Sequence, residues 1–288
     1  MSDFEPFRFV FMADCQLGAY ASFSGATEDD VEVYAANGMT IRAAPKTEGI
    51  AWDVRQYRRA IGATNRVAPA FVVMGGDMVN EPQSEAEYSA LRDVTADLNP
   101  EIPMHWVPGN HDIAFDTVVP NEASIDAYRG RFGEDSYSFE HNRVTFIVSN
   151  TVIWDHPEEL DGAWEAQLEF MERELEDARD RGSVHTIVLG HHPLFTDAAD
   201  EEDSYWNIPA ARRAPLLDLF SVYDVRAMFC GHWHRNGGGT AGGLDMVVSG
   251  PVGYPLGADP SGLRIVDVGM DAIEHRYVAL SEFDGEEN

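Results

Sequence analysis

Lysine is nearly absent from this chain. Lys46 is the only lysine among the 288 residues, and Asp plus Glu outnumber Lys plus Arg by 50 to 20, so the net charge is −30. Such a surface repels nucleic acid at long range, and it offers no basic track along which a phosphodiester backbone would bind. We therefore expect no nucleic-acid partner.

The basic residues that are present are almost all arginine. This composition, together with the heavy acidity, resembles that of proteins from salt-rich cytoplasms, and the codon bias of a GC-rich genome explains it equally well. Both explanations stay open at this point. Net charge bears on solubility and on partners, and it does not determine the fold.

Long apolar runs and cysteine are also scarce. No run approaches the ~18 apolar residues that a membrane span needs, and the first residues lack the basic and apolar pattern of a signal peptide. Two cysteines, Cys15 and Cys230, are too few for a disulfide scaffold, so we expect reduced thiols. These absences predict a soluble cytoplasmic protein with no membrane partner.

What is present is enough apolar material for a large core, at 44% hydrophobic and 11% aromatic residues. Strand-length apolar runs alternate with stretches of helical period, which predicts a layered α/β fold in a single domain, 1–288. Strands are expected at 7–13, 70–74, 104–107, 137–140, 143–150, 184–189, 225–229, 244–249, 263–268 and 273–279, the last two antiparallel. Helices are expected around 50–64, 88–98, 122–131, 164–175 and 210–223.

Turns and long connections separate these elements. His141-Asn142 is predicted as a two-residue hairpin turn, and Gly237-Gly238-Gly239 as a flexible turn, because it lacks the Lys-Ser/Thr and the helix start of a phosphate-binding loop. Segments 16–48 and 196–207 are long and contain aromatic residues. Since long loops in compact domains are usually functional, we expect them to overhang the active site as substrate walls.

Polar residues of metal-ligand type follow several of the predicted strands. In an open α/β sheet, ligands bind beyond the carboxyl ends of the strands. A single strand-end Asp is more often a turn or a helix cap, and a single His is more often a core or surface residue. The combination supplies two carboxylates, one amide oxygen and three imidazoles, which suits two cations such as Mn, Fe or Zn. The residues are Asp14, Asp77, Asn110, His191, His232 and His234.

These residues stand in a recognisable order. The motifs are Asp14-Cys15-Gln16, Gly76-Asp77, Gly109-Asn110-His111-Asp112, His191 and Gly231-His232-Trp233-His234. Over essentially its whole length the chain resembles the calcineurin-like metallophosphoesterases. The resemblance implies a four-layer αββα sandwich of two packed mixed β-sheets flanked by helices. Segments 205–207, 234–236, 244–249 and 262–264 are most similar to a branch of the family regarded as serine/threonine phosphatases.

The resemblance also implies a role for each metal-site residue. Asp77 would bridge two metal ions, Asp14 and His234 would hold the first ion, and Asn110, His191 and His232 would hold the second. A hydroxide bridging the ions would attack phosphorus. His111, which would bind no metal, would act as the general acid.

Two positions depart from the family pattern. Gln16 replaces a histidine ligand; its amide oxygen would bind metal more weakly and favour oxygen-preferring ions, or it would point away or hydrogen-bond a metal-bound water. Asn80 stands where the family often has an acid that orients the general acid. Asp112 would instead support the charge of His111, and the orienting partner stays open.

Substrate contacts are expected from Asn110, His192 and Arg235, with pocket walls that include Tyr205, Trp206 and Tyr254. The predicted function is hydrolysis of a phosphomonoester, either a phosphorylated small molecule or a phosphoprotein. The alternatives are a phosphodiesterase acting on a cyclic nucleotide or other small diester, and a catalytically degenerate metal-binding interaction module. Retention of His111 argues against the module. The sequence does not indicate an oligomeric state.

Overall fold

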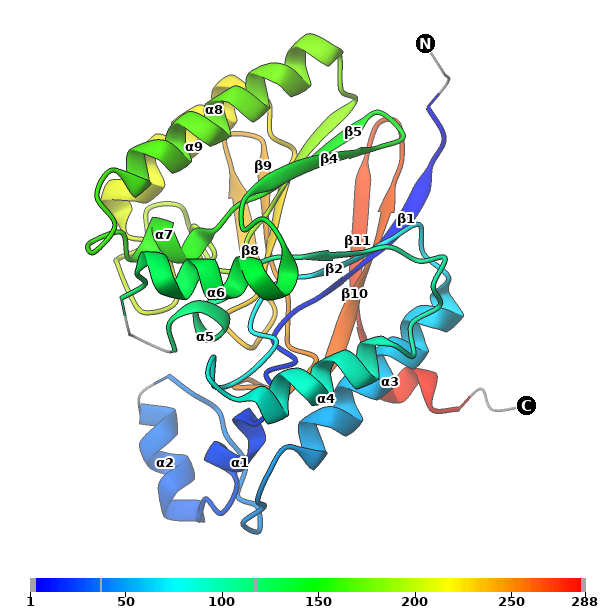
Figure 1. Cartoon of the computed structure of the whole chain (residues 1–288), viewed down its shortest axis with the longest axis vertical. Helices are drawn as coiled ribbons and strands as arrows, with labels where there is room; N and C mark the ends of the chain where they lie inside the picture. Colours follow the sequence, from blue (N-terminus) through cyan, green and yellow to red (C-terminus); the bar gives the residue numbers. More distant parts are fainter. Residues whose placement is uncertain (1–3, 37, 116–118, 286–288) are drawn as a thin grey trace.

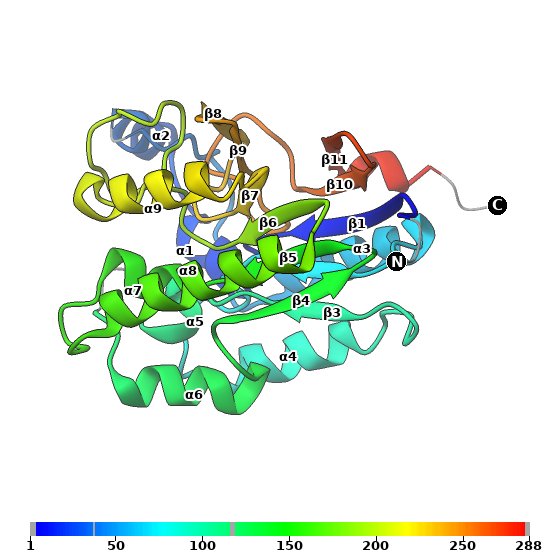
Figure 2. The ribbon, with the colours of Figure 1, turned by 90° about the horizontal axis from the view of Figure 1, so that it is seen from above.

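Two mixed β-sheets pack face to face, and helices cover the outer face of each sheet (Figure 1, Figure 2). The computed structural model describes residues 4–36, 38–115 and 119–285. The arrangement is the four-layer sandwich that the sequence predicted. None of the helices within these ranges has the length and apolar composition needed to cross a bilayer.

The first sheet has the order β11-β10-β1-β2-β3. In it β1 pairs parallel with β2 and antiparallel with β10, and β10 and β11 are antiparallel, as predicted. The strands are Phe7–Met12 (β1), Val72–Met74 (β2), Met104–Trp106 (β3), Gly262–Val268 (β10) and Ile273–Ala279 (β11). Its outer face is covered by Ala51–Val67 (α3) and Glu85–Thr95 (α4), and Leu280–Phe283 (η1) packs against α3.

The second sheet has the order β4-β5-β6-β7-β9-β8, and its central strands β5, β6, β7 and β9 are parallel. The strands are Tyr137–His141 (β4), Val144–Val148 (β5), His185–Leu189 (β6), Ala227–Cys230 (β7), Gly237–Ala241 (β8) and Leu244–Val248 (β9). Ala163–Arg181 (α8) and Ala210–Val222 (α9) cover it. Thr151–Asp155 (α7) packs against α8, whereas Glu122–Phe132 (α6) joins the core on the outer face of the first sheet through Ile125 and Tyr128 (Figure 1).

Strand β1 shows how the sequence pattern builds the layers. Successive side chains of a strand point to opposite faces. Phe9 and Phe11 enter the core between the sheets, whereas Val10 and Met12 enter the core beneath α3 and α4. Because both faces of this strand are covered from Phe9 onward, its sequence is continuously apolar there, whereas Arg8 near its start is exposed.

Two turn predictions were wrong. His141 pairs with Val144, so the hairpin turn is Asn142-Arg143, and both residues have positive φ, 45° and 67°, as a tight hairpin turn requires. The glycine run predicted as a flexible turn pairs with β9 and forms most of β8. Gly238 adopts φ 118° there, and a Cβ at this position would lie 1.8 Å from the Met246 carbonyl oxygen, so glycine permits the close approach.

The remaining short helices were not predicted. Ala19–Phe23 (α1) and Glu28–Ala36 (α2) lie within segment 16–48, of which residue 37 is outside the described residues. Asn110–Ile113 (α5) is a single turn that carries part of the metal motif. Cys15 and Cys230 are buried free thiols, as predicted.

We expect Phe9→Ala to lower the free energy of unfolding by roughly 3–5 kcal/mol, because it would open a cavity in the core between the sheets. The Phe9 ring is fully buried and stacks on Phe71 at 5.2 Å between centroids. Urea denaturation monitored by circular dichroism measures the change. In the control Val222→Ala, a 71% exposed side chain is shortened, so a shift within about 0.5 kcal/mol is expected.

Candidate active site

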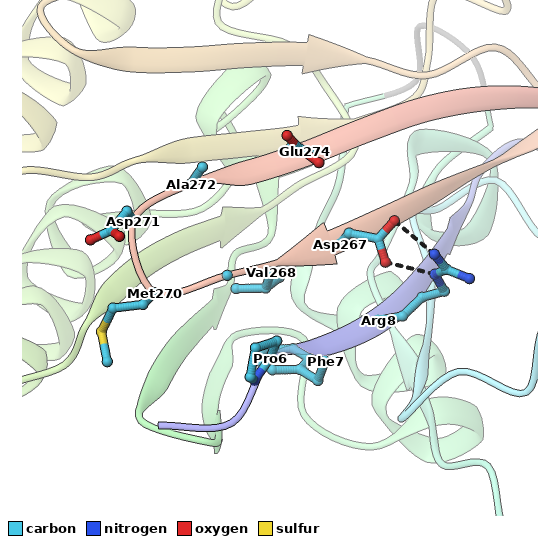
Figure 3. Close-up of a pocket in the computed structure, with 10 residues that line it drawn as sticks. Pro6, Phe7, Arg8, Asp267, Val268, Met270, Asp271, Ala272 and Glu274 are labelled. Atoms are coloured by element: carbon cyan, nitrogen blue, oxygen red, sulfur yellow. Dashed lines mark hydrogen bonds and ion pairs between the residues drawn. The ribbon is translucent and has the colours of Figure 1, made fainter. Parts of the chain in front are cut away.

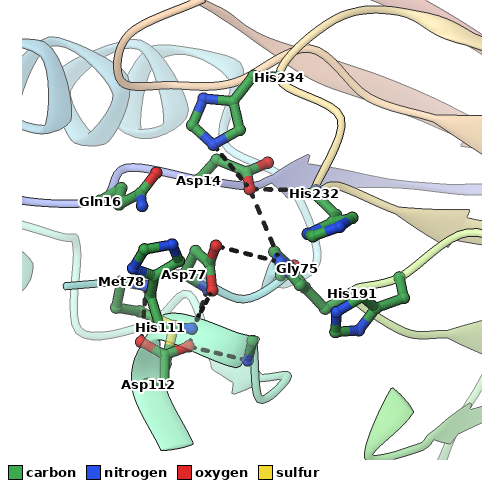
Figure 4. Close-up of polar contacts among 12 residues, drawn as sticks. Asp14, Gln16, Gly75, Asp77, Met78, His111, Asp112, His191, His232 and His234 are labelled. Carbon is green, nitrogen blue, oxygen red and sulfur yellow. Dashed lines mark hydrogen bonds and ion pairs between the residues drawn. The ribbon is translucent and has the colours of Figure 1, made fainter. Parts of the chain in front are cut away.

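The predicted ligands converge where the two sheets meet, and each sheet contributes a different kind of donor. The first sheet supplies oxygen ligands, with Asp14 after β1, Asp77 after β2 and Asn110 after β3. The second supplies imidazoles, with His191 after β6, and His232 and His234 after β7. Figure 4 shows the carboxylates and imidazoles facing one another. The site therefore exists only when the sheets are packed together.

Asp77 belongs to two groups of potential ligand atoms. One group joins it to His191 and His232, and the other joins it to Asp14 and His234; the atoms within each group lie within 4.8 Å of one another. His191 Nε2 is 3.2 Å from Asp77 Oδ2, and His234 Nε2 is 3.5 Å from Asp14 Oδ1. The grouping agrees with the division of ligands between two ions that the family resemblance implied.

Backbone carbonyls hold the second nitrogen of each histidine in the site. His191 Nδ1 lies 2.8 Å from Gly75 O, and His234 Nδ1 lies 2.7 Å from Tyr254 O. His232 Nε2 lies 2.9 Å from Tyr205 O. A carbonyl oxygen only accepts, so these ring nitrogens donate, and the opposite nitrogen of each neutral ring has a free lone pair. Such contacts orient imidazole ligands toward a metal.

Burial opposes protonation of all three histidines, but their charges differ because their neighbours differ. It lowers the pKa of His232 to about 3 and that of His234 to about 4, so both rings are neutral at pH 7. Burial also opposes protonation of His191, but Asp77 and Asp14 outweigh it and raise the pKa of His191 to about 9. A cation held by His191 would have to displace that proton, because metal ligands bind in their deprotonated form.

The two carboxylates also differ. Burial raises the pKa of Asp14 to about 8, since few positive groups offset the loss of hydration. Burial acts on Asp77 in the same direction, but His191 and His111 outweigh it and hold the pKa of Asp77 below its ordinary value. Asp77 is therefore the carboxylate that stays ionised in this cluster.

Several of these residues have a strained backbone. Asp14, Gln16, Asp77, His232 and His234 have φ values of 53°, 33°, 52°, 68° and 53°. Residues other than glycine rarely adopt positive φ, at a cost of order 1–3 kcal/mol each, and such residues cluster at functional sites. Each one sits in the turn immediately after a strand, where the left-handed conformation redirects the side chain.

Two motif glycines leave room for the carboxylates. A Cβ at Gly109 would lie 2.2 Å from Asp77 Oδ1, and a Cβ at Gly231 would lie 2.4 Å from Asp14 Oδ2. No real side chain tolerates such distances. The Gly-Asn-His-Asp and Gly-His-x-His motifs therefore need glycine because the strand ends of the two sheets approach each other closely.

Metal ions would satisfy polar atoms that the described residues leave without a hydrogen bond. Asp14 Oδ2 and Gln16 Oε1 are buried and accept no hydrogen bond from that part of the chain. The Gln16 amide nitrogen donates a hydrogen bond to Asn80 Oδ1 at 3.3 Å. The Gln16 amide oxygen is therefore the atom available to coordinate a metal ion. Unsatisfied buried oxygens among neutral imidazoles suit divalent cations.

His111 lies at the edge of this cluster. Its backbone N–H donates to Asp77 Oδ1 at 2.9 Å, and its ring lines the pocket. Its Nδ1 lies 2.8 Å from the backbone carbonyl of Asn80, which is the orienting partner that the sequence left open. Asn110 precedes it as the first residue of α5 and is buried at 4% exposure.

The predicted role of Asp112 needs correction. Its carboxylate accepts backbone N–H groups of Asp77, Met78 and Gly109 at 2.8, 2.8 and 2.9 Å. It therefore fastens the loop after β2 to the loop after β3, and the His111 ring donates instead to the backbone carbonyl of Asn80. Asp112 positions the two metal motifs relative to each other.

Two predicted substrate contacts are engaged elsewhere. His192 is buried, and its Nδ1 lies 3.1 Å from Thr151 Oγ1. Arg235 donates to the carbonyls of Gly38 and Leu256. Among the described residues that line the pocket, neither side chain appears. Both side chains are held by other partners in this structure, and their contact with substrate stays a prediction.

The pocket over the cluster has a volume of about 510 Å³. Segment 16–48 contributes Phe23 and Met39 to its lining, and segment 196–207 contributes Tyr205 and Trp206. The prediction that these long segments overhang the site is confirmed. Tyr254, also expected in the wall, instead lines a neighbouring hollow.

A second hollow, of about 570 Å³, lies at the amino end of β1, whereas the ligand cluster lies beyond its carboxyl end (Figure 3). Its polar walls include the ion pair between Arg8 and Asp267, at 2.7 Å. No histidine lines it among the described residues. The candidate metal ligands therefore lie at the other pocket, of about 510 Å³.

Several supporting residues were missed. Thr151 Oγ1 accepts the backbone N–H groups of His191 and His192, and the Glu87 carboxylate accepts those of Asn80 and Glu81. These contacts hold the loops that carry His191 and the carbonyl for His111. They involve backbone groups, which have no signature in the sequence.

Comparison with known proteins identifies the family. The model of the calcineurin-like phosphoesterase family matches residues 7–236. The chain belongs to this family. The human serine/threonine-protein phosphatase CPPED1 is 34% identical over 286 residues, covering 96% of this chain and 85% of the human protein. The branch inferred from the second half of the sequence is therefore confirmed.

A more distant relative has a different name. The 3',5'-cyclic adenosine monophosphate phosphodiesterase CpdA of Escherichia coli K12 is 30% identical over 168 residues, covering 57% of this chain and 54% of that protein. Among solved structures, a dimetal phosphatase from Danio rerio has a TM-score of 0.61 at 15% identity, covering 96% of this calcineurin-like phosphoesterase and all (100%) of that chain. The likeness to the Danio rerio structure, at 15% identity, supports the fold alone.

We expect Gly231→Ala to lower manganese content from about two ions per chain to one or fewer, because the added methyl group would displace the Asp14 carboxylate. Metal analysis after gel filtration measures it. Gly130→Ala is the matched control, since a Cβ there meets nothing within 4 Å. Retention of both ions in Gly231→Ala would show that Asp14 is not a ligand in this family member.

Proposed function

We propose that the chain is a two-metal phosphatase that hydrolyses a phosphomonoester, on a small molecule or a phosphoprotein. The observation that carries this proposal is the position of Asp77, which is shared by two groups of ligand atoms and bonded to the backbone of His111. A shared carboxylate suits a pair of cations, and an adjacent imidazole suits proton transfer to a leaving group.

Within this proposal, Asp14, Gln16, Asp77 and His234 would hold one cation, and Asp77, Asn110, His191 and His232 the other. When bound, the cations would lower the pKa of water and offset the charge of the phosphoryl oxygens. Mn and Fe are favoured over Zn, because the neutral amide oxygen of Gln16 is a harder donor than an imidazole.

His111 would supply the proton to the departing alkoxide. Its Nδ1–H donates to the carbonyl of Asn80, so Nε2 is the nitrogen from which a proton would pass to the leaving group. The carbonyl holds the ring at the pocket wall beside Asp77. Correct orientation of a proton donor is the geometric condition for general acid catalysis.

The alternative function is hydrolysis of a cyclic nucleotide. The similarity to the Escherichia coli phosphodiesterase over 57% of the chain is the observation that supports this alternative. The same donor set would serve both reactions, so the walls of the pocket decide between them. An interaction module with a degenerate site is disfavoured, because His111 is present and oriented beside Asp77. The free thiols agree with the proposed cytoplasmic location.

Chelation tests the metal dependence. Treatment with excess EDTA should abolish hydrolysis of p-nitrophenyl phosphate, and added Mn should restore it, since the proposed chemistry depends on bound cations. Full activity without retained metal would contradict the proposal. A panel that adds bis-p-nitrophenyl phosphate, cyclic AMP and a phosphoserine peptide distinguishes a monoesterase from a diesterase.

We expect His111→Asn to retain its metal ions and its fold, and to lose ~10²–10⁴ in rate on alkyl phosphates, the range for lost proton transfer. Aryl phosphates should suffer less, because a nitrophenolate departs with little protonation. The measured quantity is the ratio of alkyl to aryl phosphate turnover, compared with that of the parent enzyme.

The control is His156→Asn, which removes a 38% exposed imidazole paired with Asp155 outside the site. It should leave the alkyl to aryl ratio unchanged. If His111→Asn loses metal, or slows both substrates equally, then His111 is a ligand or a positioning residue and the proposed proton transfer is wrong.

A further inference from the structure

Within the described part of the chain, the walls of the active-site pocket are largely apolar and include no lysine or arginine. Of the described residues that line it, Asp77 is the only carboxylate, and none is a lysine or an arginine. The polar lining consists of the candidate metal cluster, His111 with Asn80 beside it, and Ser22 in segment 16–48. The walls beyond it are formed by Phe23, Met39, Phe115, Tyr205, Trp206 and Leu256.

Two arginines, Arg235 and Arg42, bond the backbone of the loops that form these walls. Arg235 donates to the carbonyls of Gly38 and Leu256, and its guanidinium lies over the Trp233 ring at 4.9 Å. Arg42 donates to Gly257 O at 3.0 Å. These contacts hold the loops that form the wall, and neither guanidinium lines the pocket among the described residues.

Phe115 is held in the pocket at a conformational cost. Its φ is 62°, a genuine outlier for a bulky residue, and its N–H donates to Asn110 O at 3.0 Å. The side chain is nevertheless 40% exposed, and its ring meets the His111 ring edge-on at 5.3 Å between centroids. Strain that places an exposed aromatic ring beside a proton donor points to a role in binding.

The opposite wall is held in place by packing. Phe23 stacks on Tyr254 at 5.4 Å, and Met39 and Trp206 pack against the same small core of Ile41, Tyr254 and Leu256. Apolar side chains in fixed positions bind apolar surface with little ordering cost. A charged group placed against them would lose its hydration without gaining a partner.

We propose, on the basis of the phosphatase function above, that this pocket selects esters whose reacting phosphoryl is their only anionic group and whose leaving group is aromatic or otherwise apolar. Phe115 is the specificity-determining residue beside the leaving group. Substrates with a second phosphate or a carboxylate are disfavoured, because the walls leave that charge unpaired and the net charge of −30 repels it at long range.

The test compares two aryl phosphates whose phenols have matched acidity and differ in one anion: para-tolyl phosphate and para-(carboxymethyl)phenyl phosphate. With the manganese-loaded enzyme, kcat/KM should favour the tolyl ester by about tenfold or more. Calorimetry with benzylphosphonate and para-carboxybenzylphosphonate should show the same order in binding. Equal or reversed preference in both measurements overturns the inference.

A second pair of substrates tests whether the natural substrate is a phosphoprotein or a small molecule. Phosphoserine peptides flanked by Phe or by Glu are compared in the same assay. A preference for the Phe-flanked peptide assigns the pocket to phosphoproteins, and a preference seen only between the aryl phosphates assigns it to small molecules. Turnover of all substrates at similar rates overturns the selectivity and leaves the phosphatase proposal standing, whereas no turnover of any of them with Mn overturns both.

Phe115→Asn removes the aromatic ring and retains a residue type that tolerates positive φ. It should reduce the preference between the two aryl phosphates several-fold, mainly through KM for the tolyl ester. The matched control is Met270→Asn, which replaces a 47% exposed apolar side chain in the hollow at the other end of β1. An unchanged preference in Phe115→Asn would contradict the role given to this residue.

Discussion

The rest of the site depends on keeping the Asp77 carboxylate ionised and buried between the two sheets. An ionised carboxylate loses much hydration free energy on burial unless charges and hydrogen bonds replace it. Here His191 lies 3.2 Å away and the His111 N–H donates at 2.9 Å. Asp112 accepts the N–H groups of Asp77 and Met78 from the adjacent loop and that of Gly109 from its own loop, and so fixes the carboxylate in place.

This arrangement has a cost in stability. Five candidate ligands have positive φ, and several buried polar atoms lack a hydrogen-bond partner within the described part of the chain. The favourable contribution comes from the apolar layers, above all the aromatic rings around Phe9, Phe146 and Phe229 between the sheets. The same packing that offsets the strain also joins the oxygen ligands of one sheet to the imidazoles of the other, so stability and site assembly are linked.

The walls of the pocket above the metal cluster are held together by a different kind of interaction. The cluster is polar and its parts are held by many hydrogen bonds, whereas the walls are apolar and held by packing among Phe23, Tyr254 and Leu256. Segments 16–48 and 196–207, which form part of the walls, are long connections between a strand and a helix of the sandwich. A family fold can therefore keep one metal chemistry and change its substrate through these loops, because the loops contribute walls and few ligands.

The sequence by itself determined the layered fold and the residues that meet at the site. Alternating and continuous apolar runs predicted the strands within a few residues, and the motif order placed Asp14, Asp77, His191, His232 and His234 in one cluster, where the structure brings them together. These features are encoded in residue type and spacing. The prediction for the glycine run was wrong, because Gly237–Ala241 forms strand β8 where a turn was expected.

Only the tertiary structure decided how each side chain is used. It bonded Asp112 to backbone amides, held His192 and Arg235 away from the pocket, and gave His111 the carbonyl of Asn80 as its partner. Backbone groups are present at every residue, so the sequence has no signal for which of them a side chain will reach. Positive φ at the ligands and at Phe115 likewise has no signal in these residue types, which ordinarily avoid that conformation.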